Sequence, residues 1–120
     1  MKDYTVTKSG EATKQDFDWG TLYWYASAQK GNSDEMTVGK CVIQPGCRNP
    51  GHMHPNCEEV LHLLRGRIRH YVQGGESFEM APGDTIAIRP NVSHYAENVG
   101  DEPAEMMIAF SAADRQTRGE

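Results

Sequence analysis

Residues 46–66 read GCRNPGHMHPNCEEVLHLLRG, with His52 and His54 one residue apart and Glu59 five positions further on. In an extended strand, residues i and i+2 point to the same face, about 6.6 Å apart. One strand can therefore aim both imidazoles at a common point. Pro55-Asn56 predicts a turn, and the apolar run after Glu59 predicts a returning strand that brings the carboxylate back. Two imidazole nitrogens and a carboxylate oxygen form the core of a transition-metal site.

A second stretch, PGDTIAIRPNVSH at residues 82–94, predicts a turn, a short apolar strand and another turn before His94. His94 offers a fourth ligand. The chain has five histidines, and three of them fall in these two stretches. His62 and His70 lie in strand-like runs without ligand spacing.

Both stretches resemble the conserved motifs of the cupin superfamily. The first motif is glycine, five residues, His-x-His, three or four residues, glutamate, six residues and glycine, and every position is met by Gly46, His52, His54, Glu59 and Gly66. The second motif is matched by Gly83, His94 and Asn98.

Two positions depart from the second motif, with Arg89 in place of a proline and Asn91 in place of a glycine. Asparagine is the commonest residue other than glycine at positive φ. We therefore expect Asn91 to keep the turn, and Pro90 to stiffen it.

The resemblance, which covers roughly residues 36–110, implies a single-domain, all-β, double-stranded β-helix, the jelly-roll barrel. It also implies that one divalent metal binds to His52, His54, Glu59 and His94. The sequence alone favours the same class, because glycine and proline interrupt short apolar segments every eight to twelve residues. Strands are expected at 21–26, 36–44, 60–64, 67–73, 77–80, 85–88, 93–98 and 105–110. The chain divides into N-terminal strands and loop (1–35), barrel core (36–110) and polar tail (111–120), the last with one short helical turn.

Composition and charge indicate which classes of partner and which compartment to expect. The 120 residues carry a net charge of −5 and no cluster of lysine or arginine, so no nucleic-acid partner is expected. No apolar run reaches the roughly 20 residues of a membrane span, and the first residues lack the apolar region of a signal peptide. We therefore expect a cytoplasmic protein. The three cysteines show no C-x-x-C spacing, which argues against a disulfide framework and leaves the role of Cys57 open.

Residues 22–26 and 106–110 are more apolar than a barrel with one wet face requires. Strands buried on both faces have this composition. We therefore expect a homodimer whose partner covers part of the outer face, with the N-terminal region as a contact. The alternative is a monomer covered by its own N-terminal strand.

Three residues are candidates for contact with a ligand. If residues 48–54 are extended, Arg48 faces the same way as His52 and could hold a carboxylate or phosphate, although it could equally face solvent. Asn98 shares the face of His94 and could orient a ligand or bond the backbone. Tyr23 could line the pocket mouth or serve packing.

Three functions fit these residues. The first is a metalloenzyme of isomerase, lyase or decarboxylase type, in which one metal (Mn, Fe, Ni, Co or Zn) acts as a Lewis acid on a small polar or anionic substrate. The second is an iron- or nickel-dependent dioxygenase. The third is a non-catalytic cupin that binds a small molecule.

Overall fold

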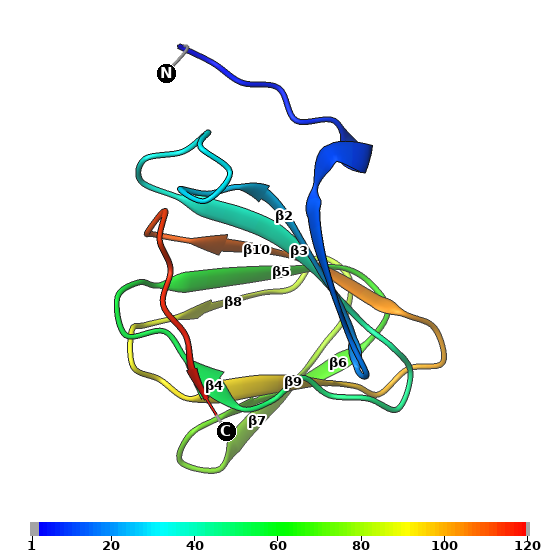
Figure 1. The fold of residues 1–120 in the computed structure, drawn as a ribbon. Coiled ribbons are helices and arrows are strands. Elements are labelled where there is room, and N and C mark those ends of the chain that lie inside the picture. The colour runs from blue at the N-terminus through cyan, green and yellow to red at the C-terminus, as the bar shows by residue number, and fades with distance from the viewer. Residues whose placement is uncertain (1–2, 120) are drawn as a thin grey trace.

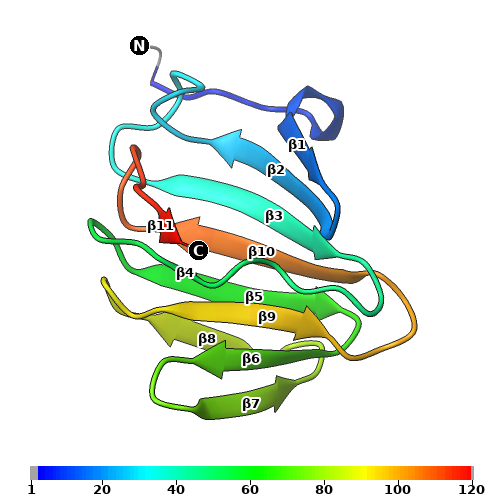
Figure 2. The same ribbon diagram turned by 60° about the horizontal axis from the view of Figure 1, so that its bottom comes forward.

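The computed structural model describes residues 3–119. Residues 1, 2 and 120, which belong to the expected N-terminal region and polar tail, lie outside the described part of the chain. Two antiparallel sheets face each other (Figures 1 and 2). The first has the order β1 (Thr13–Phe17), β2 (Gly20–Ala26), β3 (Thr37–Ile43), β10 (Ala104–Phe110), β5 (Glu59–Arg65), β8 (Thr85–Ile88). The second has the order β11 (Arg118–Gly119), β4 (His52–Met53), β9 (His94–Asn98), β6 (Ile68–Val72), β7 (Glu76–Met80).

Strands distant in sequence are neighbours in both sheets. In the first sheet β10 lies between β3 and β5, and in the second β9 lies between β4 and β6. This winding is that of a jelly roll, so the predicted all-β barrel is confirmed. The one helical element between residues 3 and 119 is a 3-10 turn, η1 (Ser9–Glu11). No helix in this part of the chain has the length and hydropathy to cross a membrane.

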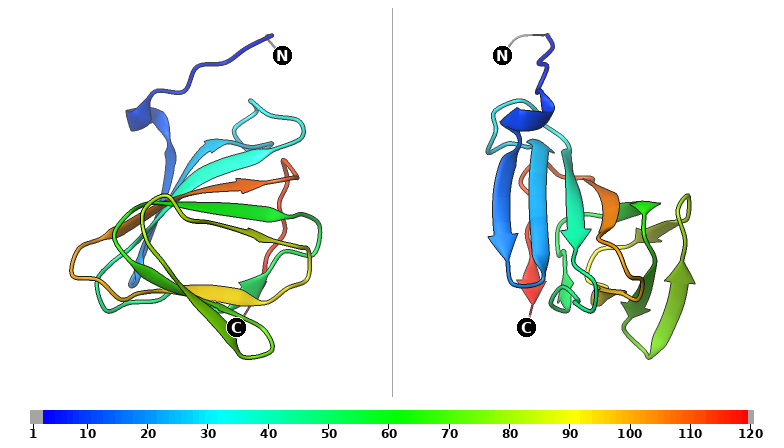
Figure 3. Two further views of the ribbon diagram at one scale, coloured as in Figure 1. Left: turned by 180° about the vertical axis from the view of Figure 1, so that it is seen from behind. Right: turned by 90° about the vertical axis from the view of Figure 1, so that its right-hand side faces the viewer.

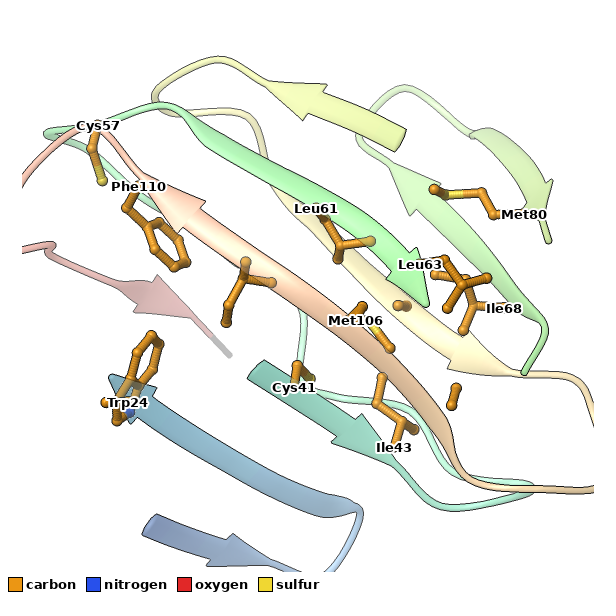
Figure 4. Close-up of a cluster of buried hydrophobic side chains, with 13 residues drawn as sticks. Trp24, Cys41, Ile43, Cys57, Leu61, Leu63, Ile68, Met80, Met106 and Phe110 are labelled. Carbon is orange, nitrogen blue, oxygen red and sulfur yellow. The ribbon is translucent and has the colours of Figure 1, made fainter. Parts of the chain in front are cut away.

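The core lies between the sheets and follows from strand alternation. Burial alternates residue by residue along β3 and β10, so every second side chain points inward. Figure 4 shows these side chains projecting from β2, β3, β5 and β10 toward one another. Ile43, Leu63, Ile68 and Met106 have no exposed surface. Burial of each such side chain contributes about 1.5–3 kcal/mol to folding.

The outer face of the first sheet is not fully buried, although strands buried on both faces were expected. Met107 and Ala109 on β10 are partly exposed on that face. Lys40 covers part of it, since its ammonium lies 4.8 Å from the Tyr23 ring centroid and 3.4 Å from a Glu105 carboxylate oxygen. The stem of a lysine can shield apolar surface while its charge stays wet. The homodimer therefore stays a prediction.

The N-terminal stretch before β1 stands away from the two sheets (Figure 3). Tyr4 and Val6, on its length, are largely exposed. The first strand of the N-terminal region is β1, further along the chain. Its residues Thr13 to Phe17 pair with β2, and all five are exposed.

The C-terminal segment, residues 111–119, crosses from the end of β10 to the second sheet (Figure 1). It contains no helix, so the expected helical turn is wrong for these residues. Its last strand, β11, pairs with β4. On the way, the Gln116 N–H donates to Asn56 Oδ1 at 2.9 Å, and Asn56 Nδ2 donates to the Asp114 carbonyl at 3.2 Å. The Asn56 side chain, in the turn between β4 and β5, therefore holds the backbone of this segment.

Candidate metal centre

Four side chains predicted as ligands converge between the sheets. His52 lies on β4, His54 follows it directly, and His94 begins β9, where it is the register partner of His52. Glu59 begins β5 in the opposite sheet. One ligand atom of each residue lies within 4.8 Å of all the others. Donors about 2.1 Å from one metal lie about 3.4 Å apart in a tetrahedral site and up to about 4.2 Å apart in an octahedral one, so small side-chain shifts suffice for coordination.

Hydrogen bonds at Nδ1 turn the Nε2 atom of each imidazole toward the cluster. His52 Nδ1–H donates to the Pro50 carbonyl at 2.8 Å, and His54 Nδ1–H donates to the Gln116 carbonyl at 2.9 Å. A carbonyl only accepts, so the proton of both rings is on Nδ1 and Nε2 keeps its lone pair. Such partners orient histidines for a metal and fix their tautomer.

Three donor atoms of the cluster are buried without a hydrogen bond from residues 3–119: His54 Nε2, Glu59 Oε1 and His94 Nε2. The Glu59 oxygen lies 3.1 Å from the first nitrogen and 3.2 Å from the second. Buried polar atoms are normally satisfied, and orphaned lone pairs that face one another are the environment a cation requires. The donor set therefore fits a divalent transition metal.

Glu59 keeps its charge although it is buried. Burial raises the pKa of this carboxyl, but when His54 and His94 are protonated on Nε2 their hydrogen bonds and charge outweigh burial and hold the pKa below its usual range. In the Nδ1–H tautomer a bound dication would take the place of those protons. The ionised carboxylate is the form that binds a metal.

His70, on β6, lies behind the cluster, and its sequence context did not reveal this position. Its Nε2 is 3.0 Å from His94 Nδ1, and its ring is 1% exposed. When His94 presents its Nε2 lone pair to the cluster, its Nδ1–H donates to His70. Burial, and next the charge that His94 can carry, lower the pKa of His70 from 6.5 to about 4.

This burial makes folding depend on pH. Between pH 6.5 and about 4, the histidine of the unfolded chain binds a proton that folded His70 does not, so stability falls as the pH falls. We expect the free energy of unfolding of the metal-free parent to fall as the pH is lowered from 7 to about 5. In His70→Gln this fall should be smaller by about 2 kcal/mol, as measured by urea denaturation. Equal losses in both proteins would contradict the neutral buried imidazole.

The cluster opens into a pocket of about 340 Å³. Its walls are mainly apolar and include Leu61, Met106 and Phe110, which Figure 4 shows pointing into the same space as Trp24. Gly39 makes room for this tryptophan, because a Cβ there would lie 2.5 Å from Trp24 Cε3. The pocket therefore combines one polar end with an apolar body, as small-molecule sites do.

Sequence reasoning missed the contribution of the two chain ends to this pocket. Phe17 and Trp19, at the turn between β1 and β2, stack with ring centroids 4.9 Å apart and line it. Arg115 and Thr117, from the segment expected to be a polar tail, line it as well. Only the pairing of β11 with β4 brings these two residues to the site, and no local sequence signal indicates that pairing.

The three candidates for ligand contact do not line the pocket. Arg48 is exposed, with its guanidinium carbon 4.4 Å from the Tyr95 ring centroid. The strand β4 begins only at His52, and the pairing register shifts by one residue between Arg48 with Glu97 and His52 with His94, so alternation does not carry from one residue to the other. The inward orientation considered for Arg48 is therefore wrong. Tyr23 faces Lys40 on the outside.

Asn98 serves the backbone, one of the two roles considered for it. It is 2% exposed, donates to the carbonyls of Ile43 and Glu102, and accepts from Gly100 N–H. Asn91 has φ 67°, so the expected turn at positive φ is confirmed. Cys57 is a free thiol buried outside the pocket lining, and burial raises its pKa.

Comparison with known proteins identifies the family. A family model described as Cupin domain matches residues 39–110, and the chain therefore belongs to the cupin family. The chain is 31% identical over 95 residues to oxalate decarboxylase OxdC of Bacillus subtilis, covering 76% of this chain and 25% of that protein. It is 29% identical over 85 residues to germin-like protein 3-8 of Oryza sativa subsp. japonica, covering 68% and 38%. The chain spans well under half the length of both relatives.

A solved structure of Lactobacillus farciminis oxalate decarboxylase in complex with formate superimposes with a TM-score of 0.84 at 23% identity. The alignment covers 92% of this chain and 34% of that one. This likeness shows that the fold is shared.

Proposed function

We propose that this protein is a divalent-metal enzyme acting on a small polar or anionic molecule, with His52, His54, Glu59 and His94 as the metal ligands. The observation that carries the proposal is the set of buried, mutually facing donor atoms without hydrogen bonds at the polar end of an apolar pocket. The ligand set suits Mn, Fe, Co, Ni or Zn. Mn(II) centres are named for the oxalate decarboxylase of Bacillus subtilis, which supports a metal of this group.

Charge favours an anionic substrate. Three neutral imidazoles and one carboxylate leave a bound dication with a net charge near +1. Such a cation supplies Lewis-acid chemistry, stabilising negative charge that develops on a substrate oxygen. The apolar walls exclude water and strengthen every electrostatic interaction inside the pocket. The carbonyls of Pro50 and Gln116 hold the His52 and His54 rings in place.

A small carboxylic acid is the substrate class we favour, with an isomerase, lyase or decarboxylase reaction. Oxalate is a small dicarboxylate, so the name of the Bacillus relative supports this class. The pocket volume of about 340 Å³ lies at the lower end of the range for small-molecule sites, which supports a small substrate.

Metal analysis tests the proposal. We expect the as-isolated protein to contain a divalent metal, and stripped protein to rebind one equivalent per chain, by elemental analysis and native mass spectrometry. The mass spectra also reveal any retained small molecule. A protein that takes up no divalent metal after stripping would refute the proposed centre.

Oxygen consumption separates the alternatives. Lewis-acid chemistry needs no O₂, so we expect iron-loaded protein to consume none above background with a panel of small carboxylic acids. Consumption that depends on one of these acids would favour the dioxygenase. Tight binding of an acid without turnover across Mn, Fe, Co, Ni and Zn would favour the non-catalytic binding protein.

A further inference from the structure

We propose that Arg115 and Thr117 form an anion-binding subsite in the pocket, and that the ligand is a small acid with a carboxylate remote from its metal-binding oxygens. This inference rests on the proposed function, since it takes the four-residue cluster as the other polar end of the ligand site. Both residues belong to the C-terminal segment and line the pocket.

Two aromatic rings hold the Arg115 side chain in place. Its guanidinium carbon lies 4.1 Å from the Trp24 ring centroid and 5.1 Å from that of Phe110. Arginine stacks well on aromatic faces, and a guanidinium fixed in this way loses little freedom when it binds an anion. The planar fork of N–H groups is suited to carboxylate geometry.

The charge of Arg115 has no acidic partner in ion-pair contact within residues 3–119. Within the same residues, the one hydrogen bond of its guanidinium goes to Thr117 Oγ1 at 2.6 Å. Burial lowers the pKa of Arg115, which indicates that the cation is poorly solvated. A carboxylate in the pocket would supply the missing charge and accept the remaining N–H groups.

Thr117 connects this cation to the metal cluster. Its oxygen accepts from Arg115 and also lies 3.2 Å from His54 Nδ1, the protonated nitrogen of that ring. Because the oxygen faces two donors, the hydroxyl proton remains available for a third group. Thr117 can therefore donate to the same anion that Arg115 binds.

The distance between the two polar ends determines the shape of the ligand. The Phe110 ring is close to both of them, with its centroid 5.1 Å from the Arg115 guanidinium carbon and 4.9 Å from the His54 ring centroid. A ligand that reaches both ends therefore passes beside this ring. It therefore carries a short apolar body between its carboxylate and its metal-binding oxygens.

A binding experiment on zinc-loaded protein tests the subsite with two probes of equal chain length. Glutarate has a carboxylate at both ends, whereas pentanoate has a methyl group in place of one of them. Adipate and hexanoate repeat the comparison with one more methylene. Both tryptophans of the chain, Trp19 and Trp24, line the pocket, so their fluorescence reports binding.

We expect the parent protein to bind at least one diacid about tenfold more tightly than its monoacid partner. Hydrogen bonds to charged groups raise binding affinity by about a factor of ten or more. Arg115→Met keeps the packing stem and removes the charge, so the preference should vanish. Arg115→Lys should keep part of it. Arg118→Met is the matched control, because Arg118 belongs to the same segment, is exposed and does not line the pocket. This variant should prefer the diacid over the monoacid as strongly as the parent does.

Zinc content is measured in every sample, which separates this inference from the proposed function. A parent protein with one zinc per chain and equal affinity for diacid and monoacid would overturn the subsite alone. An undiminished preference in Arg115→Met would do the same. A parent protein that binds no zinc would overturn the proposed function and this inference together. The comparison within the parent protein does not depend on whether any variant folds.

Discussion

Glu59→Gln is expected to reduce bound divalent metal from about one equivalent per chain to a small fraction of it, with the two sheets still folded. Glutamine has nearly the same shape, but it removes the one negative charge among the four ligands. Loss of a residue that merely supports a ligand already costs about 10- to 100-fold in metal affinity, and loss of a ligand costs more. His52→Ala should have a similar effect, because it removes one of the three imidazoles. Elemental analysis after dialysis against a fixed free-metal concentration measures both.

Two neighbours provide matched controls for these variants. Glu58 adjoins Glu59 but is exposed, so Glu58→Gln should keep the metal. His62 lies on β5 with its Nδ1 2.6 Å from Thr85 Oγ1, away from the cluster, and His62→Ala should keep it too. Circular dichroism verifies the fold of each variant. Full metal content in both folded ligand variants would show that the four residues do not form the site.

Gly66→Ala is expected to destabilise the protein by about 3 kcal/mol, because strain and a steric clash act together. Gly66 ends the first motif in the turn between β5 and β6 and has φ 87°, where a Cβ is strained. A Cβ there would also lie 2.9 Å from Ala104 Cα, which is backbone of the neighbouring strand and cannot turn away. Urea denaturation of the metal-free protein measures the loss.

Gly46, at the other end of the same motif, separates the two causes. It has φ 76°, yet a Cβ there would meet nothing within 4 Å. Gly46→Ala should therefore cost only the backbone strain, about 1 kcal/mol. If the two variants lose equal stability, the close approach to Ala104 contributes nothing.

Local patterns were sufficient to predict the strands between residues 20 and 110 and the converging side chains, but not β1 or β11. The i, i+2 spacing of His52 and His54 works because β4 is extended there, and Glu59 returns because a turn precedes β5. The asparagine at position 91 keeps positive φ, as its residue type predicts. These features depend on a few adjacent residues, so the sequence carries them directly.

The rest of the pocket depends on contacts between distant segments. His70 looked like an ordinary strand residue, and only the pairing of β6 with β9 places it behind His94. Arg115 looked like part of a polar tail, and only the return of the chain to β4 brings it inside. Alternation of side chains along a strand suggested Arg48 as the pocket arginine instead. That prediction was wrong because β4 does not extend back through Asn49. Patterns of alternation predict which face a residue takes, but not which distant segment it meets.

The pairing of β11 with the strand that carries His52 has a practical consequence for protein production. The Gly119 backbone lies against His52, so any residues fused to this end of the chain would start close to a proposed metal ligand. A polyhistidine tag there would compete with the proposed ligands for a divalent metal. Purification handles belong at the opposite end of the chain, because the described residues before β1 stand clear of the barrel (Figure 3).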